Sequence, residues 1–138
     1  MALAPVASAT TSSTELLRSL NEARAEQGVG PVRPSATLTR AARAHSADML
    51  RTEVFGHYGF VERMQRFGVR GPYVGENLAW GVGGAAEADA IVAGWLASPA
   101  HRGNLLNPRF RFVGLGFATG SFNGRAGATL VTANFAGR

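Results

Sequence analysis

Apolar residues at helical spacing mark the first element of the chain. Leu16 and Leu20 recur on one side of a helix. Ser12, with Glu15 three residues later, has the capping-box pattern with which helices begin. This pattern predicts a helix that starts at residue 12 or 13 and ends at Gly28.

A second apolar stripe follows an extended, proline-containing connector at residues 30–34. Ser35 or Thr37 caps the helix that the stripe predicts. The stripe consists of Leu38, Ala41, Ala42, His45 and Met49. Because a single polar residue on an apolar stripe usually forms its hydrogen bond within the core, we interpret His45 as a structural histidine.

The middle of the chain alternates loops with short elements. Two glycines interrupt the pattern around His57 and leave this histidine on a loop, and residues 61–67 predict a short helix. Residues 73–80 have the composition of a buried strand, interrupted by Glu76 and Asn77. A buried acid is costly unless it is paired, so Glu76 is either paired structurally or placed for use.

A helix stop and restart precedes His101. Residues 81–84 predict a loop, and residues 86–96 predict a third helix. Pro99 cannot continue this helix, whereas Ser98 and Pro99 suit the N-cap and the first position of a new one. A short helix that carries His101 therefore follows at once.

Alternating apolar residues predict a β-hairpin at the end of the chain. In residues 112–118 one face is apolar, and the other carries Gly114 and Gly116, which admit a close neighbour. An Asn-Gly turn signal follows, and residues 128–135 form the returning strand. This order of helices and strands predicts an α+β fold in which helices cover a sheet.

Charge and hydropathy narrow the function classes. The 14 basic residues are all arginines, the net charge is +5, and the arginines are spread singly along the chain. A nucleic-acid footprint would cluster on one element, so we expect no nucleic-acid partner. No apolar run approaches the ~20 residues of a membrane-spanning helix. We therefore expect a soluble monomer without a transmembrane segment.

The length of 138 residues suits one domain. Residues 1–12 contain the small-residue steps found at the end of a secretory signal, without its basic region or full apolar core. We interpret them as a disordered tail or signal remnant, and residues 13–138 as a single domain. The chain has no cysteine, so disulfides give no information about the redox compartment.

His57, Glu76 and His101 are the candidate residues for chemistry. Imidazoles and a carboxylate supply acids and bases near neutral pH. The three groups would also suffice for a zinc site with an open fourth position. Their separations match no local metal motif such as His-Glu-x-x-His, so only the fold can bring them together.

Four segments resemble the CAP superfamily, which comprises the cysteine-rich secretory proteins, antigen 5 and the pathogenesis-related 1 proteins. They are Leu20-Asn21-x-x-Arg24, Gly75-Glu76-Asn77-Leu78-Ala79, Trp95-x-x-Ser98-Pro99-x-His101-Arg102-x-Asn104-Leu105-Leu106 and Pro108-x-Phe110-x-x-Val113-Gly114-x-Gly116. The chain is most similar to the bacterial SCP-like extracellular branch, and the resemblance runs from about residue 16 to residue 135.

The resemblance implies a three-layer α-β-α sandwich with a mainly antiparallel sheet, and it implies secretion. In eukaryotic members two histidines and two glutamates line a central cleft, and some members bind a divalent metal. By motif, His57 and His101 resemble the two histidines, and Glu76 resembles one glutamate. Ser98 stands in place of the second glutamate. The chain also lacks the family's cysteines and its Trp-x-Gln-x-Phe ending.

We therefore expect a secreted domain whose cleft binds a small ligand or a divalent cation such as zinc, without established catalytic turnover. The expected catalytic or cleft residues are His57, Glu76 and His101, and the two histidines are the expected metal ligands. The expected further ligand contacts are Asn77, Ser98 and Arg102.

Three alternatives remain open. The first is a metal-assisted hydrolase in which His57 and His101 hold zinc and Glu76 is the general base. The second is a module that binds lipid or another cell-envelope component through apolar grooves. The third is a purely structural Glu76 that bonds the turn bearing His101.

Overall fold

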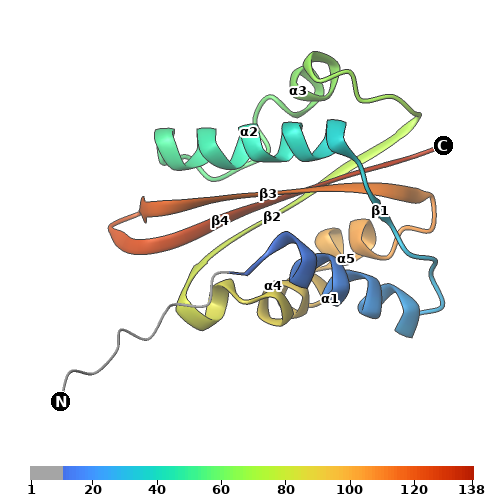
Figure 1. The fold of residues 1–138 in the computed structure, drawn as a ribbon, viewed down its shortest axis with the longest axis horizontal. Coiled ribbons are helices and arrows are strands. Elements are labelled where there is room, and N and C mark those ends of the chain that lie inside the picture. Colours follow the sequence, from blue (N-terminus) through green and yellow to red (C-terminus); the bar gives the residue numbers. More distant parts are fainter. Residues whose placement is uncertain (1–10) are drawn as a thin grey trace.

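The computed structural model describes residues 11–138, in which a four-stranded sheet separates two layers of helices (Figure 1). The helices are α1 (Ser13–Glu26), α2 (Ala36–Thr52), α3 (Phe60–Arg66), the 3-10 turn η1 (Gly83–Ala86), α4 (Ala88–Leu96) and α5 (Pro99–Leu105). The strands are β1 (Arg33–Pro34), β2 (Tyr73–Val82), β3 (Phe110–Phe122) and β4 (Arg125–Gly137). Helices α2 and α3 cover one face, and α1, α4 and α5 cover the other (Figure 1). The predicted α-β-α sandwich is confirmed.

The sheet has the strand order β1-β3-β4-β2, so β2 is an edge strand. Antiparallel pairing joins β3 to β4 and β4 to β2, and only the two-residue pairing of β1 with β3 is parallel. The prediction of a mainly antiparallel sheet is therefore confirmed. Glu76 pairs with Asn134 across β2 and β4, which places both side chains on the same face of the sheet.

The predicted loop at residues 81–84 is wrong. Gly81 and Val82 continue β2 opposite Thr129 and Ala128, and η1 follows directly. A Cβ atom at Gly81 would lie 2.9 Å from the main chain of Ala85. Glycine is thus needed at position 81 because the chain folds back tightly on the strand. From the sequence alone, a glycine required by such close packing looks the same as a glycine in an open loop.

Helix α2 lies directly on β3, because Gly114 and Gly116 leave room for its backbone. A Cβ atom on Gly114 would come within 2.0 Å of the main chain at Leu38, and one on Gly116 within 2.3 Å of Ala42. The whole predicted stripe of α2 is buried. Thus the glycine face of the hairpin and the small residues of α2 fit each other.

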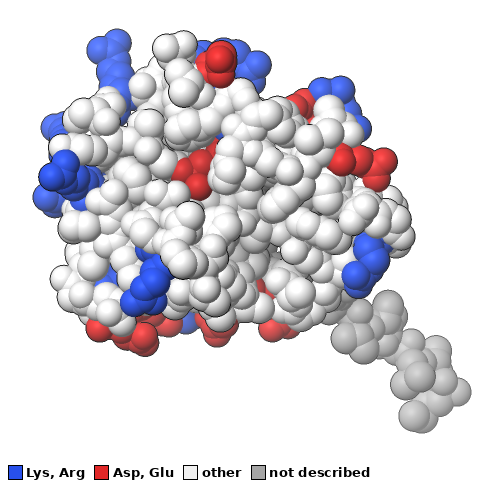
Figure 2. Space-filling view, turned by 180° about the vertical axis from the view of Figure 1, so that it is seen from behind, with Lys and Arg blue, Asp and Glu red and all other residues white. Residues whose placement is uncertain are grey.

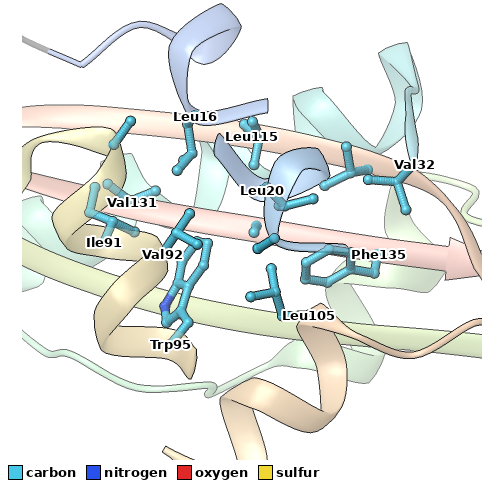
Figure 3. Close-up of a cluster of buried hydrophobic side chains, with 14 of the residues drawn as sticks. Leu16, Leu20, Val32, Ile91, Val92, Trp95, Leu105, Leu115, Val131 and Phe135 are labelled. Atoms are coloured by element: carbon cyan, nitrogen blue, oxygen red, sulfur yellow. The ribbon is translucent and has the colours of Figure 1, made fainter. Parts of the chain in front are cut away.

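The opposite face of the sheet carries the main hydrophobic core (Figure 3). Residues from α1, α4, α5 and the hairpin form it, among them Leu16, Leu20, Ile91, Val92, Trp95, Leu105, Leu115, Val131 and Phe135. Burying one such side chain contributes roughly 1.5–3 kcal/mol. This core fixes α4 and α5 beside the edge strand β2.

Helix α1 begins as predicted, because the Ser12 hydroxyl accepts a hydrogen bond from the Glu15 amide at 3.1 Å. The preceding Thr11 is buried, and its hydroxyl donates to the carbonyl oxygen of Ala86 at 2.6 Å. Residues 11 and 12 of the predicted tail therefore lie in the folded part. The rest of that tail, residues 1–10, lies outside the described residues.

Candidate functional site

Glu76 lies at the centre of a buried polar cluster on β2. Its Oε1 accepts a hydrogen bond from His57 Nδ1 at 2.9 Å. Its Oε2 accepts from Asn134 Nδ2 at 2.7 Å and from the guanidinium of Arg63. Because the Glu76 side chain is only 2% exposed, the guanidinium compensates a charge that water does not reach.

His45 joins this cluster from α2. Its Nε2 lies 2.8 Å from the carbonyl oxygen of Gly56 and 3.8 Å from Glu76 Oε1. A carbonyl oxygen only accepts, so the hydrogen of the ring is on Nε2. Burial lowers the pKa of His45; the negative charge of Glu76 raises it, and the positive charge of Arg63 lowers it again. The buried hydrogen bond fits the predicted structural role.

The loop after α2 carries His57 to the cluster. Helix α2 ends at Thr52, and its C-cap residue Glu53 has a left-handed backbone (φ 55°) that reverses the chain. Gly59 (φ 65°) is the N-cap residue of α3, the helix that carries Arg63. His57 thus donates to Glu76 from a short connection between two helix ends, and its side chain remains 53% exposed.

Asn77 lies on the opposite face of β2 from Glu76, because successive strand side chains alternate. Its Nδ2 donates to the carbonyl oxygen of His101 at 2.9 Å, and its Oδ1 accepts from Asn104 Nδ2 at 3.0 Å. Asn104 Nδ2 also lies 3.1 Å from the main-chain oxygen of Glu76. The side-chain amide of Asn77, and not the carboxylate of Glu76, therefore holds the helix that bears His101.

Trp95 fixes the neighbouring helix α4 to the same strand. Its Nε1 donates to the carbonyl oxygen of Leu78 at 2.9 Å, and the indole is buried in the core. Side chains from α4 and α5 therefore satisfy main-chain carbonyl groups of the edge strand. The α4–α5 corner is held at a fixed position along β2.

An open groove of about 410 Å³ lies at this corner, between β2, α4 and the loop after α2. Its lining residues are Phe55, Leu78, Ala79, Trp80, Ala85, Ala90, Ile91, Gly94, Trp95, Ser98 and His101. Apart from Ser98 and His101, all of these residues are aliphatic, aromatic or glycine. The groove is thus an apolar surface with one polar end.

Ser98 and His101 form the polar end. The Ser98 hydroxyl lies 2.9 Å from His101 Nδ1, and His101 Nε2 forms no hydrogen bond to another residue within 11–138. Ser98 is the N-cap residue of α5 and Pro99 its first residue, as predicted, but the Ser98 hydroxyl bonds the imidazole instead of the helix backbone. This contact orients the ring and leaves one ring nitrogen for a ligand.

The family model "CAP: Cysteine-rich secretory protein family" matches residues 17–135. The chain belongs to the CAP family. Within the described residues, no helix is long and apolar enough to cross a membrane.

Two curated relatives of this CAP domain come from Bacillus subtilis. YkwD is 36% identical over 102 residues, which are 70% of this chain and 38% of the relative. YlbC, whose name describes a membrane protein, is 31% identical over 112 residues, which are 78% of this chain and 32% of the relative. The chain thus spans a little over one third of the length of YkwD and a little under one third of that of YlbC.

Solved structures share the CAP fold. An extracellular protein of Bacillus anthracis that contains an SCP domain aligns with a TM-score of 0.76 and 26% identity, over 91% of this chain and 40% of that one. An outer surface protein of Borrelia burgdorferi aligns with a TM-score of 0.72 and 19% identity, over 89% of this chain and 90% of that one. The second likeness shows the fold alone.

The CAP domain brings two of the three predicted catalytic residues together. His57 and Glu76 are in contact, whereas His101 bonds Ser98 and forms no hydrogen bond with either of them. Asn77 is buried and bonds the chain of α5. Arg102 is exposed on α5 and forms no ion pair with a described carboxylate.

These residues do not fit a metal site that includes Glu76. The Glu76 carboxylate already accepts from three side chains, and the Arg63 guanidinium would repel a cation. Two buried side-chain atoms of the cluster, Arg63 Nε and Asn134 Oδ1, have no hydrogen-bond partner. Arg63 Nε is a donor and cannot bind a metal, so of these two atoms Asn134 Oδ1 alone could serve as a metal ligand. Among residues 11–138, no three histidine, cysteine, aspartate or glutamate side chains are grouped to hold an ion.

Sequence reasoning missed Arg63 and Asn134. Arg63 belongs to the predicted helix at residues 61–67, but nothing in the sequence distinguishes it from its exposed neighbour Arg66. Asn134 would have been found from the pairing register of β2 with β4, which places it opposite Glu76. The register depends on long-range pairing that no local pattern gives.

Proposed function

We propose that this CAP domain is a secreted binding domain whose groove takes a small, mainly apolar ligand with a hydrogen-bonding group. The observation that carries the proposal is the lining of the groove, which is apolar except for the Ser98–His101 pair. Sites for small organic ligands have this composition, with a few polar groups that fix orientation. His101 would donate or accept through Nε2, depending on its tautomer.

The Glu76 cluster would support this groove instead of binding the ligand. The hydrogen bond from His57 to Glu76 ties the loop after α2 to β2, and Phe55 of the same loop forms part of the groove wall. Buried charge pairs of this kind fix geometry. The proposal thus gives His57 and Glu76 a positioning role, and His101 and Ser98 the ligand contacts.

Secretion is part of the proposal. Two solved structures that resemble the chain are an extracellular protein and an outer surface protein. A ligand of a domain outside the cell would be a small molecule or a component of the cell envelope.

Filling the groove tests the proposal. Gly94 lines the groove, and a Cβ atom added to it would meet no atom within 4 Å. Gly94→Leu should therefore occupy the groove without disturbing the core. Gly103→Leu is the matched control, since Gly103 is also an open helical glycine but does not line the groove.

The assay is calorimetric titration with octanol, octanoate and phenol. We expect saturable binding of at least one probe to the unaltered chain and to Gly103→Leu, and its loss in Gly94→Leu. His101→Ala should weaken the same binding by about 3- to 10-fold, the value of one hydrogen bond. Absence of binding by every probe, or equal loss in both leucine variants, would refute the proposal.

The zinc hypothesis makes a separate prediction. If His57 and His101 held zinc, calorimetry would show saturable heat that disappears in His57→Ala and in His101→Ala. We expect no such heat, because the carboxylate that would complete the site is already bonded to Arg63. Saturable zinc binding lost in both variants would instead favour the metal-binding function.

A hydrolase is the second candidate, favoured by the contact between His57 and Glu76. A buried carboxylate that accepts from Nδ1 orients an imidazole and leaves Nε2 to exchange a proton. In this arrangement His57 would be the general base, and Glu76 would position it. Turnover of ester or peptide substrates that is abolished by His57→Gln would support this role, and turnover that survives would exclude it.

A further inference from the structure

A second hollow, independent of the groove, gathers arginines that are far apart in the sequence. It has a volume of about 670 Å³, and Arg24, Arg33, Arg111 and Arg138 line it beside Pro108 and Phe112. No aspartate or glutamate side chain is among its lining residues. The arginines are therefore spread singly along the sequence, but the fold brings four of them together at this hollow.

The fold places two of these arginines side by side. The parallel pairing of β1 with β3 sets Arg33 opposite Phe112, next to Arg111. In the pairing of β3 with β4, Phe110 lies opposite Gly137 and Phe112 lies opposite Ala136. Arg111 is therefore the extra residue of a β-bulge in β3. Such bulges redirect side chains and are frequent beside binding sites.

Arg24 adds a buried positive charge to the hollow. Its side chain is 1% exposed, and its guanidinium donates to the carbonyl oxygens of Gly30, Leu105, Asn107 and Phe110. No carboxylate within the described residues 11–138 forms an ion pair with it, and burial lowers its pKa. A charged group bonded only to backbone carbonyls leaves its positive potential available to an anion.

The exposed arginines of the hollow are also unneutralised. Arg33, Arg111 and Arg138 form no ion pair with an aspartate or glutamate within residues 11–138. Elsewhere on the surface, Arg18 is paired with Glu22 and Arg51 with Asp48. Arginine side chains are visible along the left edge of Figure 2, at the end of the molecule where the C terminus lies in Figure 1.

We propose that this hollow is a binding site for a phosphorylated ligand that carries at least two negative charges. Guanidinium groups donate paired hydrogen bonds to phosphate oxygens, and arginine favours this geometry over the point charge of lysine. The concave shape and the prolines and phenylalanines beside the arginines suit an organic phosphate whose carbon atoms are partly buried. The source of the phosphate is either a soluble molecule or the headgroup of an anionic lipid.

Tripolyphosphate is the first probe, measured by calorimetry at low and at physiological salt. We expect saturable binding that weakens as salt rises. The variant with Arg33→Gln and Arg111→Gln should bind at least about tenfold more weakly, because two charge-assisted contacts are lost. Both residues are exposed, so the fold should be retained.

Arg125→Gln is the matched control. Arg125 is exposed at the start of β4, at the opposite end of the strand from Arg138. Its substitution by glutamine also removes an arginine charge from the surface, but far from the hollow. Tripolyphosphate binding should be nearly unchanged in this variant. Equal weakening in the control, or no binding by the unaltered chain at low salt, would overturn the proposal.

Vesicles distinguish the two sources. Phosphatidic acid vesicles that retain the unaltered chain, but not the Arg33/Arg111 variant, would identify a lipid headgroup as the source, provided that phosphatidylcholine vesicles retain neither. Tripolyphosphate binding without vesicle retention would identify a soluble phosphate.

Discussion

The Glu76 cluster lies between β2 and the helices α2 and α3, whereas the groove with His101 lies at the edge of β2 beside α4, and the two use their polar groups differently. In the cluster, both oxygens of a buried carboxylate are occupied by His57, Arg63 and Asn134. In the groove, a single imidazole keeps one nitrogen without a partner inside residues 11–138. The Glu76 cluster thus uses its charged groups to hold the fold together. In the groove, one polar group remains available on an apolar surface, and the ligand is expected there.

Removing the carboxylate from the cluster should have the largest effect. Glu76→Ala leaves the Arg63 guanidinium buried without its counter-charge, which costs about 3–5 kcal/mol of the free energy of unfolding. Denaturant unfolding of both proteins measures this difference. A loss below about 1 kcal/mol would mean that the cluster is not a supporting element.

The Arg63→Met change separates charge from packing. In the Glu76→Ala background it removes the orphaned cation, so we expect it to restore part of the lost stability, whereas alone it should destabilise. If the two changes add without interaction, the pairing of Arg63 with Glu76 does not contribute to stability.

On the groove side, Asn77→Ala should have a smaller effect. It removes the donor to the His101 carbonyl oxygen and the acceptor of Asn104, and we expect a loss of about 2 kcal/mol. Octanol binding should weaken at the same time, because α5 carries His101. Arg102→Ala, an exposed change on the same helix, should alter stability by no more than about 0.5 kcal/mol.

The smallest expected effect is a pH dependence from His45. Burial lowers its pKa below the ordinary value of 6.5, so the unfolded chain takes up a proton at a higher pH than the folded chain does. The contribution of His45 to the free energy of unfolding is therefore complete above pH 6.5. It declines as the pH falls below this value, by at most about 1.4 kcal/mol per pH unit. The lowered pKa of Asp48 acts only below 3.8, outside this window.

His45→Gln tests this assignment. Glutamine keeps a donor for the Gly56 carbonyl oxygen but does not titrate, so stability between pH 7.5 and pH 5.5 should fall less steeply in the variant. His57→Gln, at an exposed ring, is the comparison. The assignment fails if the slope of His45→Gln equals that of the unaltered chain.

Local patterns were sufficient to predict most of the fold. The Ser12 cap, the α2 stripe, the restart at Pro99 and the glycine face of the hairpin all follow from side-chain chemistry within a few residues. The loop predicted at 81–84 failed, because strand pairing overrides a glycine-rich composition.

The candidate site was harder to predict. The family motif identified His57, Glu76 and His101, but strand alternation places Glu76 and Asn77 on opposite faces, so the carboxylate does not reach the helix of His101. The pairing of Glu76 with Arg63 and the arginine hollow both depend on segments that meet only in the folded chain.

The three histidines report directly on the account, because His45 lies in the cluster, His57 at its rim and His101 in the groove. Nuclear magnetic resonance of the imidazole rings during an octanol titration follows all three at once. We expect the His101 signals to shift with saturation and the His45 signals to stay in place. Shifts of His45 and His57 with an unchanged His101 would contradict the account and make the Glu76 cluster the binding site.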